Sequence, residues 1–591
     1  MTGTPSAGAS AFCGDWLLTF TRRGDGWPTR HPGGDWQPLH RAGDGTLWTQ
    51  PPGEGWRGAP WASHEEGDWK LWLLGETYPL AGPPADLWHG IPDARTRPTQ
   101  LNGHCLLLAW NRRNGEWHLW TDRFGTLHAY RAAGASDTAV GTCFRAVAGA
   151  SRRQLDWLGL TGFCALGFFP QDRTHFEDVR ILRPASHYVF AADGAAVRGD
   201  RYWQWRFEPD LQRSYEETVD ELARRLDSVM ADLTRGRQVA LPISGGLDSR
   251  STVAALGVDR PEVQAYSYGY SANSKEVDIA RRIAARRSLP FHGFEIRPYL
   301  FARLDRVQES LEGFQDVTLS RQQAVTDELA EWADFVIAAH WGDVWLDDMG
   351  LSHHAGEDEA LLCHVMGRIG KPGGWLIDHL CRRHLGREDP HQLVRSMVLQ
   401  ELAGFEEIED ADFRVKAFKT DQWSFRATTA ALRSYQPGAF PRLPFYDTRL
   451  TDFFATVPSA RMRGRKLQID YLKRHAPDLA RVTWDAYETN LYRVPYFNSL
   501  LLPKRAAKRL WRTLTRRQAV ERNWEVQLRE EAGRQGLQHW LLRPGLKLHE
   551  LVPPTDLSQL LETFSAPRPS PALGYTVSMI LTLSVWLEAH G

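Results

Sequence analysis

Residues 239–250 read VALPISGGLDSR, in which an apolar run leads directly into small and hydroxyl-bearing residues. Gly245 and Gly246 keep a turn free of side-chain bulk and permit positive φ angles. A helix that begins near Asp248 or Ser249 points its free N–H groups and its positive dipole end at this turn, and helix ends of this kind bind anions. The order of apolar strand, glycine turn and helix therefore predicts a phosphate-binding loop.

Asp248 is the unusual member of this loop, because a carboxylate beside phosphate is repelled unless a cation lies between them. Mg²⁺ favours a carboxylate together with phosphate oxygens, so it is the expected cation. Ser244 and Ser249 can add hydroxyl donors to the backbone N–H groups of the turn. The GK[ST] ending of a Walker A loop is absent. The loop therefore indicates a magnesium-bound polyphosphate, and the alternative is an ordinary strand-to-helix turn capped by serines.

Alternating strand and helix patterns surround the loop and must hold it in place. From residue 238 the chain runs through QVALPIS, STVAALG, EVQAYSYGY, EVDIARRIAARRS, PFHGFEI and WADFVIAAH. This alternation predicts a parallel sheet with helices on both faces. A helix is expected just before it, beginning at Ser214 with a capping box to Glu217 and ending at Gly236.

The flanking residues predict two further regions. Short apolar runs separated by Gly, Asn and Asp fill residues 1–205, which is typical of stacked antiparallel sheets. Residues 353–591 are mostly helical by pattern. We therefore expect an α+β and α/β protein with domains at residues 1–205, 206–500 and 501–591.

Composition excludes several classes of protein. The net charge of −1 selects neither nucleic acid nor an acidic membrane surface. Six cysteines show no CxxC spacing, which argues against a disulfide scaffold or a zinc site and favours a reducing cytoplasm. No signal-peptide pattern is present at residues 1–16. The longest apolar run, residues 575–587, is shorter than the roughly 20 residues of a membrane span, so a buried core helix is expected.

The SGGLDS loop resembles the pyrophosphate loop of the N-type ATP pyrophosphatases, which cleave ATP between the α- and β-phosphates. Four flanking stretches resemble the asparagine synthetase family in the correct order: LGETYPL (74–80), QLNGHCLLLAWNRRNGEWHLWTDRFGTLHAYRA (100–132), CALGFFPQDRT (164–174) and LPFYDTRLTDFFATVP (443–458). The resemblance implies an N-terminal Ntn-hydrolase-like sandwich of the type 2 glutamine amidotransferase kind. An ATP-pyrophosphatase domain and a helical C-terminal extension would follow. The residues that it implies for ATP binding are Ser244, Gly245, Gly246, Leu247, Asp248, Ser249 and Gly342.

The second acidic motif of this family resembles AAHWGDVWLDDMG (338–350), which follows an apolar strand. Both loops would then lie at the carboxyl ends of parallel strands, where ligands bind. The resemblance implies that Asp248 and Asp343 share Mg²⁺ on the triphosphate. The family's glutamate falls at or near His340, which could act as a base at neutral pH. Asp347 and Asp348 read as a solvated turn.

The family's lysine that stabilises the adenylation transition state has no equivalent in residues 482–496. Other basic residues could replace it through space: Lys466, Lys473, Arg493 and Lys504, with Arg250 beside the loop as a further phosphate contact. The sequence does not choose among them.

The glutaminase nucleophile of the family is an N-terminal cysteine, and the nearest candidate is Cys13. Its use would require removal of twelve residues. Leu74 stands where the family's glutamine-binding stretch has asparagine. The simpler interpretation is that Cys13 is a small buried apolar residue and that the domain has only a structural role. This departure resembles the β-lactam synthetases and lasso peptide cyclases, in which the substrate supplies the amine.

The sequence therefore predicts an ATP- and Mg²⁺-dependent ligase that adenylates a carboxylate and joins it to an amine. A natural-product enzyme or lasso-type macrolactam cyclase is the specific hypothesis, acting on a small-molecule or peptide carboxylate with a precursor peptide or partner peptidase nearby. Glutamine-dependent amidation after processing at Cys13 is one alternative. A catalytically inactive nucleotide-binding homologue is another. Nucleic acid and a membrane span are not expected, and the oligomeric state is left open.

Overall fold

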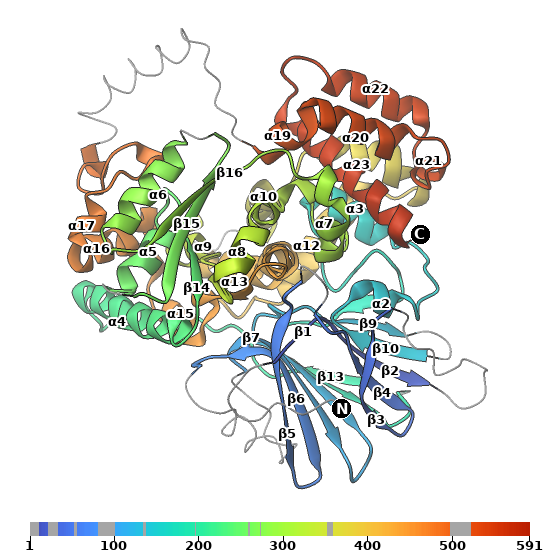
Figure 1. Cartoon of the computed structure of the whole chain (residues 1–591), viewed down its shortest axis with the longest axis horizontal. Helices are drawn as coiled ribbons and strands as arrows, with labels where there is room; N and C mark the ends of the chain where they lie inside the picture. Colours follow the sequence, from blue (N-terminus) through green and yellow to red (C-terminus); the bar gives the residue numbers. More distant parts are fainter. Residues whose placement is uncertain are drawn as a thin grey trace.

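The computed structural model describes residues 11–21, 34–52, 56–80, 101–133, 137–194, 197–257, 260–271, 274–351, 358–496 and 522–590. Within these ranges the chain is a mixed α/β protein with two antiparallel sheets and one parallel sheet. Figure 1 shows the antiparallel strands gathered in one region (mostly blue), strands β14 (Val239–Pro242), β15 (Val263–Gly269) and β16 (Phe291–Glu295) of the parallel sheet in another (green), and the C-terminal helices in a third (red).

The antiparallel strands form two sheets. The first has the order β1 (Ala11–Cys13), β5 (Ala59–Glu66), β6 (Trp69–Thr77), β7 (Gly103–Asn111), β8 (Trp117–Thr121), β12 (Ser186–Phe190) and β13 (Val197–Arg201). The second has the order β11 (Val179–Ile181), β9 (Tyr130–Ala133), β10 (Asp137–Gly141), β2 (Trp16–Thr21), β4 (Gly45–Thr49) and β3 (Gln37–Ala42).

Large apolar side chains fill the space between these two sheets. Trp72 and Trp117 stack with ring centroids 5.8 Å apart and share one core with Phe20 of the other sheet. Gly45 faces Trp117 so closely that a Cβ there would lie 2.6 Å from the indole nitrogen. The tryptophan therefore requires glycine at this position, because interiors leave no room for a further methyl group.

Helix α4 (Tyr215–Thr234) leads into the parallel sheet. Its capping box is present as predicted, with Ser214 accepting a hydrogen bond from the Glu217 N–H and Glu217 bonding back to the Ser214 backbone. The helix buries one face, including Leu222 and Leu226, against the core. This burial explains the 3.6-residue spacing of its apolar side chains.

The parallel sheet has the order β16 (Phe291–Glu295), β15 (Val263–Gly269), β14 (Val239–Pro242), β17 (Phe335–Ile337) and β18 (Phe440–Arg442). Helices α5 (Asp248–Ala255) and α6 (Lys275–Ala285) follow β14 and β15, as the alternating pattern predicts. Strand order reverses at β14, since β15 lies on one side of it and β17 on the other. In open parallel sheets a crevice for ligands forms at this switch point.

The remaining regular structure is helical. The longer helices are α3 (Trp157–Leu166), α7 (Leu304–Leu311), α8 (Thr326–Trp332), α10 (Asp358–Ile369), α12 (Pro390–Ala403), α13 (Ala411–Lys419), α15 (Thr448–Phe454), α16 (Lys466–His475), α19 (Asn523–Arg529), α20 (Glu531–Leu542), α22 (Pro554–Phe564) and α23 (Pro571–His590). Short helices are α2 (Phe144–Ala148), α9 (Gly342–Trp345), α11 (Gly374–Leu376), α14 (Thr429–Leu432), α17 (Pro477–Ala480) and α21 (Leu548–Leu551).

Among the described helices, α23 alone has the length and composition that could cross a membrane. In this structure 72% of its most apolar window is buried inside the protein. Trp586 stacks on His175 at 4.0 Å, and the Ser578 hydroxyl donates to Asp316 at 2.6 Å. These contacts place residues 575–587 in the core, where the sequence pattern expects them.

A buried ion pair ties the antiparallel sandwich to the parallel sheet. Arg442 of β18 binds both carboxylate oxygens of Glu76 of β6, at 2.7 and 2.8 Å. Its guanidinium also lies 3.5 Å from the ring centroid of Phe335, and only 2% of the Arg442 surface is exposed. Bidentate geometry of this kind is favourable for a buried arginine.

Candidate active site

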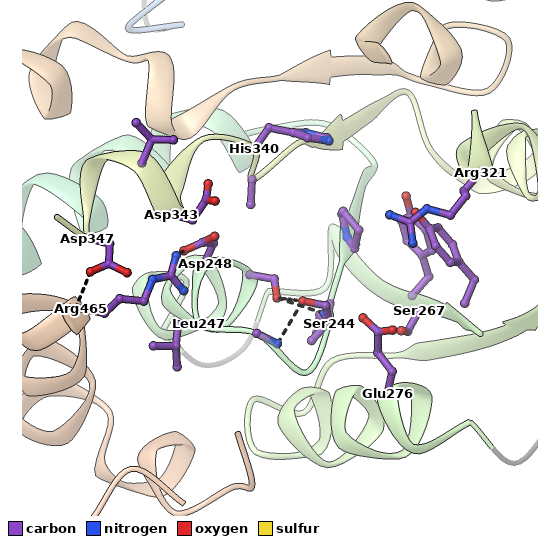
Figure 2. A pocket seen from close by; sticks show the side chains of 18 of the residues that line it. Ser244, Leu247, Asp248, Ser267, Glu276, Arg321, His340, Asp343, Asp347 and Arg465 are labelled. Atoms are coloured by element: carbon purple, nitrogen blue, oxygen red, sulfur yellow. Dashed lines mark hydrogen bonds and ion pairs between the residues drawn. The ribbon is translucent and has the colours of Figure 1, made fainter. Parts of the chain in front are cut away.

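A cavity of about 490 Å³ opens at the carboxyl ends of the parallel strands. Its wall includes the SGGLDS loop after β14, the start of α9 after β17, and residues of the helical region. Figure 2 shows Asp248, Asp343 and Arg465 toward one end, Glu276 and Arg321 toward the other, and Ser244 between them. The volume is in the range of small-molecule sites.

The glycine loop is held by its own serines. Ser249 Oγ accepts from the Ser244 N–H at 3.0 Å, and Ser244 Oγ accepts from the Gly246 N–H at 3.2 Å. Neither Gly245 nor Gly246 adopts a positive φ angle. Gly245 is needed for space instead: a Cβ there would lie 2.6 Å from Cβ of Asp485.

Asp248 is the first residue of α5, as the sequence predicts. One of its carboxylate oxygens accepts from Arg465 Nη2 at 2.9 Å and from Gln468 Nε2 at 3.1 Å. Burial raises the pKa of this carboxyl group; Arg465 opposes the shift and the negative charge of Asp343 adds to it. The structure therefore holds two carboxylates close together, which favours a bound cation.

Gly342 makes this approach possible. A Cβ at position 342 would lie 2.9 Å from the carboxyl carbon of Asp248. Asp343 follows in the first turn of α9, and Figure 2 shows its carboxylate beside that of Asp248. Two loops that are far apart in sequence thus bring both predicted aspartates to one wall of the cavity.

His340 also lines this cavity. Burial lowers the pKa of its imidazole to about 4, despite the opposing charge of Asp343. The Nδ1 atom is buried and finds no hydrogen-bond partner among the described residues. His340 is therefore neutral at pH 7 and a weak base, and a bound ligand could supply the missing partner.

Four of the five basic residues considered from sequence are described by the structure, and none of these four lines the cavity. Lys466 Nζ lies 3.4 Å from the ring centroid of Tyr215, and Lys473 Nζ lies 3.8 Å from Asp470 Oδ1. Arg493 is exposed elsewhere on the surface. The remaining two candidates are Arg250, which is buried and donates to backbone carbonyls of residues 482 and 483, and Lys504, which lies outside the described residues.

Four other cations line the cavity: Arg321, Arg368, Lys419 and Arg465. Sequence reasoning missed all four. Arg465 directly precedes Lys466, which is one of the residues considered from sequence. Its backbone is left-handed, with a φ angle of 60°. Asp347 and Asp348 also line the cavity, so they are not merely a solvated turn. Asp347 accepts from the backbone N–H groups of Asp348 and Arg465.

The residues of this cavity fit a magnesium ion only if a polyphosphate supplies further ligands. Among the described residues no three His, Cys, Asp or Glu side chains converge to hold a metal by themselves. Asp248 and Asp343 supply two carboxylates, and Mg²⁺ is usually bound by one or two carboxylates plus phosphate oxygens and water. The pair therefore fits magnesium that arrives with a nucleotide.

Cys13 is the last residue of β1 and pairs with Ala59 of β5. Its thiol is buried, and burial raises its pKa to about 12. Glu76, in the stretch that resembles a glutamine-binding strand, is already bound by Arg442. Neither side chain is available for glutamine chemistry in this conformation.

We expect iodoacetamide at pH 8 to leave Cys13 unmodified while the exposed Cys363 reacts. The thiolate is the reactive species, and a pKa near 12 leaves a thiolate fraction of about 10⁻⁴ at that pH. Peptide mass spectrometry of the native protein measures both positions. Equal labelling of Cys13 and Cys363 would contradict the buried position of Cys13.

Comparison with known families gives a match for the part of the site that contains the glycine loop and Asp248. Residues 221–330 match the family model described as asparagine synthase. The asparagine synthase match begins within α4, includes the glycine loop and α5, and ends before β17 and Asp343. It supports a relationship to that family through a minority of the chain. No curated protein matches the sequence.

Three solved structures show only weak similarity. One is a glutamine-dependent NAD+ synthetase from Acinetobacter baumannii in complex with ADP, with 18% identity, 27% of this chain and 35% of that chain covered, and a TM-score of 0.17. Another is glutamine phosphoribosylpyrophosphate amidotransferase from B. subtilis complexed with ADP and GMP, with 10% identity, coverage of 48% and 59%, and a TM-score of 0.18. The third, an allosteric regulatory enzyme of purine biosynthesis, has 11% identity, coverage of 49% and 76%, and a TM-score of 0.20. Such scores support no argument about this protein, and the chain spans less than two thirds of the first two.

Proposed function

We propose that this chain is an ATP-dependent ligase that transfers AMP to a carboxylate, releases pyrophosphate and joins the acyl group to an amine. The meeting of Asp248 and Asp343 beside the glycine loop is the observation that carries this proposal. The asparagine synthase match of residues 221–330 supports an ATP-using amide-forming ligase.

In this proposal the glycine loop and the first turn of α5 direct N–H groups at the β- and γ-phosphates. Asp248 and Asp343 would hold magnesium, which neutralises charge on the departing pyrophosphate. Arg465 holds Asp248 in place through its hydrogen bond. The cavity keeps carboxylate and α-phosphate together, and such positioning supplies much of the acceleration. His340, being neutral, can accept a proton only weakly.

The amine is proposed to come from the substrate rather than from glutamine. The buried Cys13 and the Arg442-bound Glu76 support this part of the proposal. A peptide or small molecule that carries both groups would close to a lactam, so macrolactam formation of the lasso peptide type is the specific form we propose. The setting would be the cytoplasm, with all six thiols free.

We expect the nucleotide products to be AMP and pyrophosphate, formed only with Mg²⁺ and with the correct carboxylate present. A loop that holds the β- and γ-phosphates as one leaving group directs attack to the α-phosphate, whereas Walker-type loops release ADP. Ion-exchange chromatography of the reaction mixture distinguishes the two outcomes. ADP as the sole product would contradict the proposal.

Two alternatives predict different results. A glutamine-dependent amidotransferase would show an N-terminus at Cys13 by mass spectrometry and would release glutamate from glutamine. A catalytically inactive homologue would bind ATP without turning over any nucleotide, even with the cognate carboxylate present.

A further inference from the structure

Lys419, the last residue of α13, is a buried cation on the cavity wall. Only 7% of its surface is exposed, and no carboxylate lies within 4 Å of its ammonium group among the described residues. Its polar contact is Met349 Sδ, at 3.9 Å. Lys416, one turn earlier in the same helix, is also buried but pairs with Asp412 at 3.3 Å.

An ammonium group buried without a partner is costly, so proteins rarely keep one unless a ligand supplies the counter-charge. Two aromatic rings offset part of that cost: Lys419 Nζ lies 5.6 Å from the ring centroid of Trp341 and 4.8 Å from that of Trp423. Trp341 is itself fixed, because its indole N–H donates to Thr420 Oγ1 at 3.0 Å. These rings hold the ammonium group in a set position.

A second cation lies close by on α10. Arg368 lines the same cavity, and its positive charge lowers the pKa of Lys419 in addition to the larger effect of burial. Arg368 Nη2 donates to the Met349 carbonyl at 2.8 Å, and no described carboxylate pairs with it. Two neighbouring cations that both lack a carboxylate partner form a site for an anion.

The position of these cations indicates which anion they bind. The triphosphate belongs at the glycine loop and α5, whereas Lys419 and Arg368 come from helices outside the parallel sheet. Lys419 Nζ lies 5.6 Å from the ring centroid of Trp341, which precedes Asp343 by two residues, and Lys419 and Asp343 both line the cavity. An acyl group that attacks the α-phosphate must lie in that part of the cavity, next to the nucleotide.

We propose that Lys419 and Arg368 bind the substrate carboxylate that becomes adenylated; this inference rests on the proposed ligase function. The lining of the cavity also includes the carboxylates of Asp347 and Asp348, which would repel a second acidic group. The substrate class is therefore a monocarboxylate, and an amine on the same molecule is tolerated while a second carboxylate is not.

Butyrate and succinate are suitable probes of this site, with binding followed by saturation-transfer NMR in the presence of AMPPNP and Mg²⁺. We expect butyrate to bind the wild-type protein more tightly than succinate. Lys419→Met should weaken butyrate binding by about 10- to 100-fold, since a charged hydrogen bond is lost. Lys371→Met is the matched control, because Lys371 also lies over the Trp423 ring, at 5.4 Å, but does not line the cavity.

Thermal unfolding separates this role from a structural one. Removing a buried charge that has no partner should leave the Tm of Lys419→Met equal to or above that of the wild type. A lysine retained only for stability would lower the Tm when it is replaced. Arg368→Gln provides a second variant, with weaker butyrate binding and an unchanged Tm expected.

Calorimetry of AMPPNP binding distinguishes failure of this inference from failure of the ligase proposal. Unchanged AMPPNP affinity with weakened butyrate binding in Lys419→Met supports the carboxylate site. Loss of AMPPNP affinity with butyrate binding retained would assign Lys419 to phosphate and overturn it, as would no butyrate binding to the wild type. A wild type that binds butyrate through Lys419 but never binds AMPPNP would support the site and refute the ligase proposal.

Discussion

Asp248→Asn is expected to lower ATP–pyrophosphate exchange by about 10³-fold while leaving the protein folded. The substitution keeps the shape of the side chain and removes the charge that would hold magnesium against pyrophosphate. Exchange is measured with labelled pyrophosphate once a carboxylate substrate is in hand. Asp278→Asn on α6 is the control, since that carboxylate is 62% exposed and its ion pairs among the described residues are with neighbouring arginines of its own helix.

The stability of Asp248→Asn should be preserved or increased, although its exchange activity falls. Because burial raises the pKa of Asp248, the folded state binds a proton more tightly than the unfolded chain does. The wild type therefore loses stability as pH rises from the ordinary carboxyl pKa through the raised one, and Asp248→Asn lacks that loss. The variant should melt at or above the wild-type Tm at pH 7. Wild-type exchange rates, or an unfolded variant, would remove Asp248 from the proposed role.

Arg442→Ala should destabilise the protein by about 3–5 kcal/mol, the usual result of leaving one member of a buried ion pair without its partner. Glu76 would remain as a charge at the junction of the sandwich and the parallel sheet. Urea denaturation followed by circular dichroism measures the loss. Arg382→Ala is the control, because its pair with Asp378 is about half exposed on both sides and should contribute no more than about 1 kcal/mol.

A double variant tests whether the charge itself is responsible. Glu76→Gln combined with Arg442→Met removes both charges, so it should recover much of the stability lost in Arg442→Ala. If Arg442→Ala costs no more than Arg382→Ala, the buried pair does not join the two regions in the way that its geometry suggests.

Local sequence patterns predict several features of this structure. The capping box at Ser214 and the strand, loop and helix around Asp248 depend on neighbouring residues, so the sequence shows them directly. Placing Asp343 beside Asp248 follows from a general rule, since carboxyl ends of adjacent parallel strands share one edge. Such features require no knowledge of distant side chains.

Other features depend on contacts that no local pattern reveals. A long helical region separates β17 from β18 in the sequence. Arg442 contacts Glu76 because β18 joins the parallel sheet beside β17. Lys419 reads as one more basic residue at a helix end, and its lack of a partner appears only when the packing around it is known. The sequence predicts that Gly245 keeps the turn free of side-chain bulk, but it does not show that the neighbour requiring this space is Asp485, from a distant segment.

Helix α23 has a consequence for how the chain folds. Its Tyr575 hydroxyl donates to the Cys164 carbonyl, a partner that is synthesised 411 positions earlier. The aromatic surface around His175 and Phe176 that Trp586 covers must therefore stay open to solvent or to chaperones through most of translation. Contacts of such sequence separation slow folding and leave apolar surface exposed in intermediates. Refolding from denaturant should accordingly be slow and prone to aggregation, with docking of α23 among its last steps.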